Sequence, residues 1–166
     1  DGENIYGGKY FIPEDKINIF NKLYHRDVFI NKKPEYLTEV QLKSQNRPIV
    51  VDFDFRYSPD VTKRKHSIEH IEDIIMVYVD CFNKLMGINL EIPVYVMQKD
   101  NVNCLENVTK DGIHIIFGIA CDSIIQQMIR ENVKTDIENI IEELELVNNI
   151  DDVLDLGISQ GHTNWQ

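Results

Sequence analysis

The chain has 166 residues, of which 43% are hydrophobic and 27% charged, so it can bury a core without disulfide or metal support. The same composition, with only 8 Gly and 5 Pro, excludes an intrinsically disordered or low-complexity chain. The formal net charge of −11 argues against a uniformly basic nucleic-acid-binding surface, although basic residues cluster locally at 63–66.

No segment reaches the roughly 20 apolar residues that cross a bilayer, and residues 1–13 show no export signal, so we expect no membrane partner. The three cysteines, Cys81, Cys104 and Cys121, form no CxxC pair, which favours a reducing, intracellular compartment. Because the chain begins without Met and stops at Gln166, we expect it to be cut from a longer polypeptide and truncated at its C-terminal end.

Residues 1–47 predict a small N-terminal α/β module packed on the core that follows. A short strand is expected at residues 8–12, and apolar residues at helical spacing in EDKINIFNKLY predict an amphipathic helix over 14–24. After a polar turn, YLTEVQ predicts a second short strand over 36–41.

Residues 48–166 predict the core. In PIVVDFDFRY, over 48–57, apolar and acidic residues alternate as in a strand with one buried face. A polar, basic loop follows, and then a helix is expected with Ser67 as its cap and Gly87 at its end. Its apolar stripe is predicted to contain Ile68, Ile71, Ile75, Val79, Phe82 and Met86.

The second half of the core predicts strands at 90–98 and 113–119, separated by a turn-rich connection over 102–112. Asp122 is expected to cap a long helix that is broken near 132–135. VLDLGIS, over residues 153–159, predicts a last strand. The order of elements after residue 48 is the split βαβ arrangement, so we expect an α+β fold with an RNA-recognition-type antiparallel sheet and flanking helices.

Asp52 and Asp54 are the first candidates for chemistry. Residues two apart in a strand point to the same face, about 6.8 Å apart, so both carboxylates project side by side. A desolvated carboxylate pair needs a cationic partner, and Mg²⁺ or Mn²⁺ suits such oxygen ligands. The competing interpretation is a solvated sheet face on which Arg56 or a lysine balances the charge.

His114 alternates with Ile113, Ile115 and Phe117 along the strand predicted at 113–119. If this strand lies beside the 48–57 strand with its apolar residues toward the same core, His114 emerges on the aspartate face. There it could donate a charge-assisted hydrogen bond to a phosphate oxygen. A histidine flanked by isoleucines is otherwise more often a structural residue.

Three ordered segments, PIVVDFDFRY, KDGIHIIFGI and VLDLGISQGHTNWQ, resemble the motifs of the archaeo-eukaryotic primase (primase-polymerase) superfamily. The likeness extends to the N-terminal primase region of primase-helicases of nucleocytoplasmic large DNA viruses, which GGKYFIP and YLTEVQ also resemble. The resemblance covers almost the whole chain and implies a DNA primase or polymerase domain for DNA replication. Its activity would be metal-dependent, template-directed nucleotidyl transfer.

Carried onto this chain, the first motif matches Asp52 and Asp54, the second His114, and the third Asp155. The resemblance implies that the three aspartates hold two divalent ions, Mg²⁺ or Mn²⁺, and that His114 steadies the triphosphate.

The identity of the third acidic ligand stays open, because Asp151 and Asp152 lie close to Asp155 and a shift in register would exchange them. Lys110 and Arg56 are the nearest basic candidates for nucleotide contact, and each is as readily explained as a surface residue. Trp165 could stack on a base, although a lone tryptophan near a terminus is more often a packing residue.

The implied partners are a single-stranded DNA template, nucleoside triphosphates and a helicase module farther along the same polypeptide. The implied location is a viral replication site in the cytoplasm or nucleus of the host. Two alternatives stay open. A metal-dependent nuclease or phosphoesterase would use the same carboxylates with water as nucleophile, and a non-catalytic interaction module of a helicase would need none of them.

Overall fold

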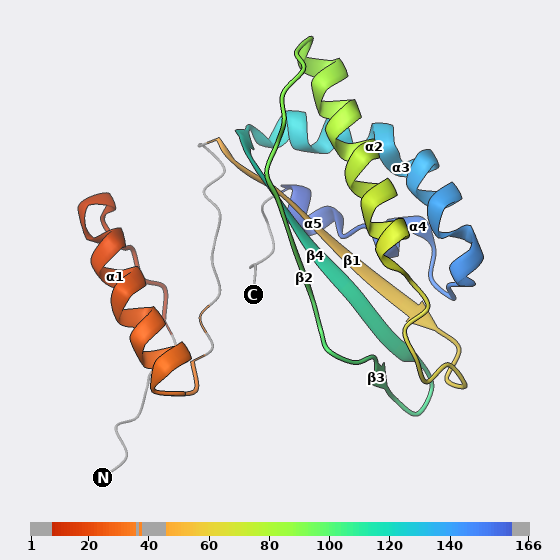
Figure 1. Ribbon diagram of the computed structural model, residues 1–166, viewed down its shortest axis with the longest axis horizontal. Coiled ribbons are helices and arrows are strands. Elements are labelled where there is room, and N and C mark those ends of the chain that lie inside the picture. The colour runs from red at the N-terminus through yellow and green to blue at the C-terminus, as the bar shows by residue number, and fades with distance from the viewer. Residues whose placement is uncertain (1–7, 36, 38–45, 161–166) are drawn as a thin grey trace. The chain divides into compact units, whose positions relative to one another are not determined.

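The computed structural model describes residues 8–35, 37 and 46–160 of the chain (Figure 1). The chain divides into two compact units, residues 1–37 and residues 38–165. The predicted packing of an N-terminal module on the core stays a prediction.

The first unit is helical over most of its described length. A 3-10 turn (Glu14–Lys16), helix α1 (Ile17–Tyr24) and a π-helical segment (His25–Ile30) follow one another without interruption. The helix predicted at 14–24 is therefore confirmed, and helical backbone continues beyond it. The aromatic ring of Phe29 lies 6.3 Å from that of Tyr24, so a ring contact links α1 to the π-helical segment.

Of the two short strands predicted for residues 1–47, one is wrong and the other lies almost entirely outside the described residues. The strand predicted at residues 8–12 is wrong, because these residues are irregular in the described part of the chain. A short strand needs a neighbouring strand to satisfy its backbone. The strand predicted at 36–41 lies outside the described residues, apart from Leu37.

The second unit is built on an antiparallel sheet. Its strands are β1 (Arg47–Tyr57), β2 (Val94–Gln98), β3 (Asn103–Cys104) and β4 (Thr109–Cys121). Strand β4 is central, with β1 along one edge and β2 and β3 along the other. The connection predicted at 102–112 is partly wrong, since β4 already begins at Thr109.

The last strand of the predicted arrangement is reduced to one residue. Leu154 makes an isolated antiparallel bridge with Phe53 on the outer edge of β1. Chain order and strand order thus match two split βαβ units, and the predicted α+β, RNA-recognition-type sheet is confirmed. A longer strand over 153–159 is wrong. The Asp155 carboxylate accepts a hydrogen bond from the Gly157 amide, and helix α5 (Leu156–Gln160) begins there instead.

Helices α2 (Ile68–Met86) and α3 (Ser123–Ile141) lie side by side on one face of this sheet (Figure 1). Ser67 and Gly87 cap α2 as predicted, with a capping box and a left-handed backbone conformation respectively. Asp122 caps α3 by accepting a hydrogen bond from the Ile125 amide. The predicted break near 132–135 is wrong, because Val133 is buried within one continuous helix.

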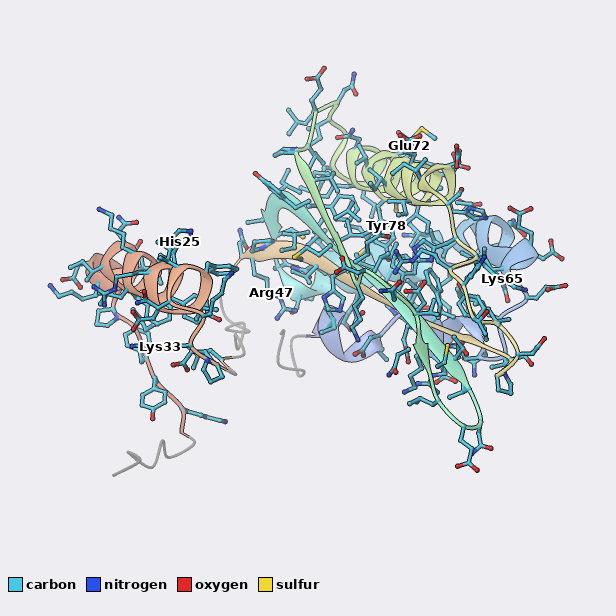
Figure 2. All side chains as sticks on the ribbon, turned by 60° about the horizontal axis from the view of Figure 1, so that its bottom comes forward. His25, Lys33, Arg47, Lys65, Glu72 and Tyr78 are labelled. Atoms are coloured by element: carbon cyan, nitrogen blue, oxygen red, sulfur yellow. The ribbon has the colours of Figure 1, made fainter. Side chains whose placement is uncertain are left out.

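The core lies between the two helices and the sheet. In Figure 2, Tyr78 points from α2 toward the sheet, whereas Glu72 points to the outer side. The buried stripe of α2 differs from the predicted one, since Ile68 and Met86 at its two ends are exposed. Its buried members are Ile71, Ile74, Tyr78 and Phe82. From the sheet, β1 and β4 contribute side chains that are almost completely buried: Phe53, Phe55, Tyr57, Ile113, Ile115 and Phe117.

A buried ion pair ties the loop between β1 and α2 to the sheet. Arg64 donates from Nε and Nη2 to the two carboxylate oxygens of Asp111, at 2.9 Å each, and the Asp111 side chain is 0% exposed. The same guanidinium donates to the Lys99 carbonyl oxygen at 2.6 Å. His66 lies beside this pair, 3.4 Å from the Asp111 carboxylate, and burial lowers its pKa.

Replacing Arg64 tests how much this pair contributes. We expect Arg64→Met to lower the free energy of unfolding by about 3–5 kcal/mol, because Asp111 is left as a buried charge without its cation. Urea unfolding measures the loss. The control is Lys33→Met, which removes an exposed pair with Asp27 and is expected to leave the free energy of unfolding nearly unchanged. Equal losses in the two variants would contradict the expectation.

Candidate functional site

The sheet face opposite α2 and α3 carries the two predicted aspartates. Along β1, Phe53 and Phe55 point to the helices, so Asp52 and Asp54 point to the opposite face, where both are half-buried. Tight packing of the phenylalanines fixes this alternation. The carboxylates therefore stand next to each other on the face of β1 that points away from the helices.

His114 lies directly opposite Asp52 in the antiparallel pairing of β4 with β1. Its Nε2 atom is 3.2 Å from Oδ1 of Asp52, and the two side chains are 37% and 29% exposed. The imidazole is thus within hydrogen-bond distance of the carboxylate and still reachable from solvent. The structure brings these two predicted residues together through backbone register.

Arg56 and Lys110 lie at one end of the same face, opposite each other across β1 and β4. Arg56 donates from Nε and Nη2 to Oδ2 of Asp54, at 2.9 and 2.7 Å. This carboxylate raises the pKa of the Arg56 guanidinium. Arg56, predicted to contact nucleotide, is therefore engaged with Asp54. Lys110 is half-buried and makes no ion pair within the described part of the chain.

Asp155 reaches the site through its backbone. Its amide donates to the carbonyl oxygen of Asp52 at 3.2 Å, on the outer edge of β1. Its carboxylate accepts from the Gly157 amide at 2.7 Å, so it also starts helix α5. Asp155 thus has a turn-and-cap role, and its amide lies beside the backbone of Asp52.

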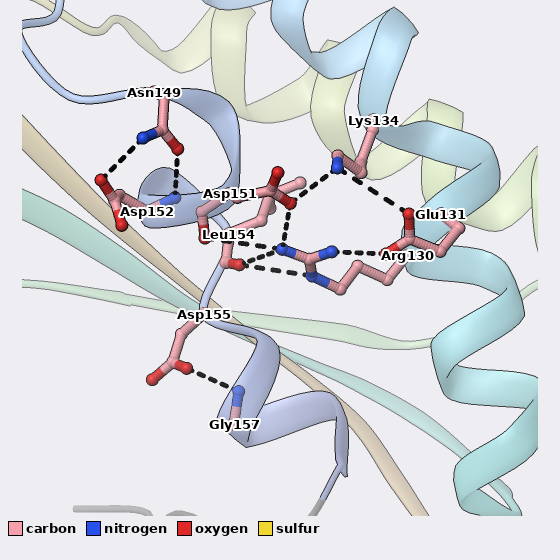
Figure 3. Close-up of polar contacts among 9 residues, drawn as sticks. All are labelled: Arg130, Glu131, Lys134, Asn149, Asp151, Asp152, Leu154, Asp155 and Gly157. Atoms are coloured by element: carbon pink, nitrogen blue, oxygen red, sulfur yellow. Dashed lines mark hydrogen bonds and ion pairs between the residues drawn. The ribbon is translucent and has the colours of Figure 1, made fainter.

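Asp151 is engaged elsewhere. Its Oδ1 atom accepts from Nζ of Lys134 at 2.6 Å and from Nη2 of Arg130 at 3.1 Å, as Figure 3 shows. The hydrogen bond from Lys134 and then that from Arg130 lower the pKa of Asp151. This carboxylate is held by helix α3 and not by β1.

Asp152 belongs to a local cap in helix α4 (Ile150–Val153). Its carboxylate accepts from Nδ2 of Asn149 at 2.9 Å, and its amide donates back to Oδ1 of Asn149 at 3.0 Å (Figure 3). Among the three acids left open by the sequence, Asp155 is the one whose amide is bonded to the Asp52 carbonyl.

The residue types on this face suit a hard divalent cation. Asp52 and Asp54 offer carboxylate oxygens on one strand, and Asp155 follows the residue that bridges to that strand. Such oxygens are the ligands that Mg²⁺ and Mn²⁺ prefer. The carboxylates point to His114, Arg56 and the Gly157 amide, and no cluster of three metal-ligating side chains occurs among the described residues. Metal binding by the three aspartates requires these partners to be exchanged.

Two features of this face were missed by sequence reasoning. Gly112 lies opposite Asp54, and a Cβ atom there would collide with the Phe53 carbonyl oxygen. Gly112 therefore allows β1 and β4 to approach closely beside Asp54, between Lys110 and His114. This close approach depends on tertiary structure, so no local pattern in the sequence indicates it.

The second missed feature is an apolar end of the face. Strand β2 pairs with β4 so that Met97 lies opposite His114 and Tyr95 opposite Ile116. Tyr95 and Met97 are exposed, at 63% and 43%. The alternation in VYVMQ could have indicated this, had the pairing partner of the strand been known.

Trp165, considered for base stacking, lies outside the described residues.

Among the described residues, no helix is both long and apolar enough to pass through a bilayer. The cysteines at 81, 104 and 121 are all free thiols.

Comparison with known proteins gives two findings. A family model described as the C962R protein N-terminal AEP domain matches residues 3–166. A protein of Acanthamoeba polyphaga mimivirus named "Putative helicase L207/L206" is 28% identical over 162 residues. That match covers 95% of this chain but only 16% of the viral protein, so the chain spans about a sixth of the relative's length.

The half-exposed contacts of Asp52 with His114 and of Asp54 with Arg56 lead to a stability prediction. We expect Asp52→Asn and Asp54→Asn each to change the free energy of unfolding by about 1 kcal/mol or less in metal-free buffer, because exposed pairs contribute little. Urea unfolding provides the measurement. Asp111→Asn, the same substitution at a buried pair, is the control and should cost more than about 2 kcal/mol. A large loss at Asp52 or Asp54 would show that these residues hold the fold together.

Proposed function

Because the chain belongs to the family of the C962R protein N-terminal AEP domain, an archaeo-eukaryotic primase family, we propose that it catalyses template-directed nucleotidyl transfer. The family predicted from the three sequence motifs is thereby confirmed. The observation that supports the activity best is the side-by-side arrangement of Asp52, Asp54 and His114 on the sheet face opposite the helices. These are the residues that the family motifs assign to chemistry.

In the proposed reaction the 3′-hydroxyl of a primer or first nucleotide attacks the α-phosphate of a nucleoside triphosphate, and pyrophosphate leaves. Mg²⁺ or Mn²⁺ bound at the site would supply Lewis-acid stabilisation of the charge on the phosphates. Asp52, Asp54 and Asp155 would hold these ions. For this, Asp54 must release Arg56, whose guanidinium then becomes available to a phosphate.

His114 is suited to bind a phosphate oxygen. Its Nε2 atom already lies 3.2 Å from a carboxylate oxygen of Asp52 and is reachable from solvent. A phosphate oxygen that takes the place of this carboxylate oxygen would receive the same hydrogen bond. Lys110, four residues from His114 on the same face of β4, adds a positive charge to the phosphate end of the site.

The apolar end of the face suits a nucleobase. Tyr95 lies two strands across from β1 and one pleat along from Asp52, a separation of about 12 Å from the strand spacings. A nucleotide whose phosphates lie at His114 could thus extend its base toward Tyr95 and Met97. Aromatic side chains on a sheet bind bases of any sequence by stacking.

The wider context follows from the viral relative. The mimivirus protein is named as a helicase and is about six times as long as the matched segment, so this chain would act beside a helicase module in one polypeptide. Its proposed partners are a single-stranded DNA template and nucleoside triphosphates, and its proposed location is the viral replication site in the host cytoplasm or nucleus. The net charge of −11 predicts weak binding of DNA outside the site.

A primer-synthesis assay tests the function. With Mn²⁺, a single-stranded template and labelled nucleotides, we expect dinucleotides or extended primers from the wild-type chain. We expect at least a 100-fold loss in Asp52→Asn, because one of the proposed metal ligands is removed. Asp136→Asn, which removes an exposed carboxylate on α3, is the matched control and should retain activity.

Other outcomes of the same assay would identify the competing functions. Shortened template or primer in place of extended product would indicate a metal-dependent nuclease. If the parent polypeptide works normally with both Asp52→Asn and Asp54→Asn, the domain is a non-catalytic interaction module and the proposal is wrong.

The base position is tested by truncating Tyr95. We expect Tyr95→Ala to raise the KM for nucleotide or template by about 5- to 100-fold, since one stacked base contributes about 1–3 kcal/mol. Tyr95→Phe keeps the ring and is expected to behave like the wild type. Tyr10→Ala removes another exposed tyrosine in the N-terminal unit and serves as the control. An unchanged KM in Tyr95→Ala would contradict the stacking.

A further inference from the structure

Helix α3 carries a buried arginine that no step of the proposed chemistry uses. The side chain of Arg130 is only 3% exposed, although arginine is among the residues least often buried. A buried guanidinium is tolerated only where hydrogen bonds and opposite charges replace its water. The partners of Arg130 therefore indicate what its burial achieves.

Most of these partners belong to one short segment of chain. Arg130 donates to the Leu154 carbonyl oxygen from Nε at 3.3 Å and from Nη2 at 2.7 Å (Figure 3). Nη2 also reaches Oδ1 of Asp151 at 3.1 Å and its carbonyl oxygen at 3.5 Å. The remaining bond, from Nη1 to Glu131 at 2.5 Å, stays within α3. Four of the five bonds thus end on residues 151–154.

The Leu154 carbonyl belongs to the same peptide plane as the amide of Asp155. That amide donates to the Asp52 carbonyl oxygen at 3.2 Å. One rigid peptide unit is therefore held from two sides, by Arg130 through its oxygen and by β1 through its nitrogen. Rotation of this plane would break both contacts and would turn the Cα of Asp155, and with it the carboxylate.

We propose that Arg130 is a positioning residue that fixes Asp155 beside Asp52 by holding the Leu154–Asp155 peptide plane. The proposal rests on the proposed function, in which Asp155 is a metal ligand. It gives a reason for arginine at this position, because its planar fork meets one carbonyl with two donors, whereas lysine offers a single point charge.

A neighbouring residue separates this role from simple anchoring of the segment. Lys134, one turn along α3, also pairs with Asp151, whereas the hydrogen bonds to the Leu154 carbonyl come from Arg130. Lys134→Met therefore weakens the attachment of the segment and leaves the peptide plane held. Arg130→Lys keeps the charge and removes the fork.

The test uses the full 166-residue chain and three readouts. Hydrogen exchange of the Asp155 amide is followed by NMR without metal, Mn²⁺ affinity is titrated, and the urea midpoint reports global stability. We expect Arg130→Lys to speed Asp155 exchange at least 10-fold and to weaken Mn²⁺ binding by about 10- to 100-fold, as for other groups that orient ligands. We expect Lys134→Met to change both by less than about twofold.

The outcomes separate the two proposals. If Asp155→Asn weakens Mn²⁺ binding but Arg130→Lys changes neither exchange nor affinity, the positioning role is wrong and the proposed function stands. If Asp155→Asn leaves Mn²⁺ affinity unchanged, Asp155 is not a metal ligand. Its proposed role in the reaction and the positioning role of Arg130 are then both wrong. Equal effects in Arg130→Lys and Lys134→Met would overturn the positioning role. If Arg130→Lys does not fold, Arg130→Gln, which still donates to one carbonyl, is measured against the same criteria.

Discussion

The antiparallel register between β1 and β4 is the constraint on which the site depends. Asp52 faces His114 because Phe53 pairs with Ile113 and Val51 with Ile115 on the other side of the sheet. A slip of one residue on either strand would move the imidazole or the carboxylates to the helix side. Burial of the large apolar pairs opposes such a slip, so the hydrophobic core sets the geometry of the polar face.

One face of β1 therefore stabilises the fold, and the other face contributes little to stability. Phe53, Phe55 and Tyr57 are fully buried and hold the strand in place, whereas Asp52 and Asp54 keep contact with solvent. Their pairs with His114 and Arg56 are exposed enough to be weak. Weak pairs suit a binding site, because an incoming ion or phosphate can replace one partner without disturbing the core.

Asp155 lies at the edge of β1 and is positioned differently from Asp52 and Asp54. No continuous strand delivers Asp155, since the bridge of Leu154 to Phe53 is a single residue long. The segment is held instead by the burial of Val153 and Leu154, by Arg130 from helix α3 and by the bond of the Asp155 amide to β1. The last two contacts hold the peptide plane before Asp155, which is why a buried arginine outside the proposed site is relevant to it.

The sequence by itself determined the elements whose signals are local. The alternation over 48–57, the caps Ser67 and Gly87, and the apolar spacing around His114 each identify an element, because neighbouring residues carry the whole pattern. Only the tertiary structure decided which of Asp151, Asp152 and Asp155 bonds to β1 through its amide, and that Arg56 pairs with Asp54. Those outcomes depend on contacts between residues distant in the chain. Asp151, Asp152 and Asp155 cannot be distinguished by local sequence, because their contacts with Arg130 and with the edge of β1 differ only in the folded chain.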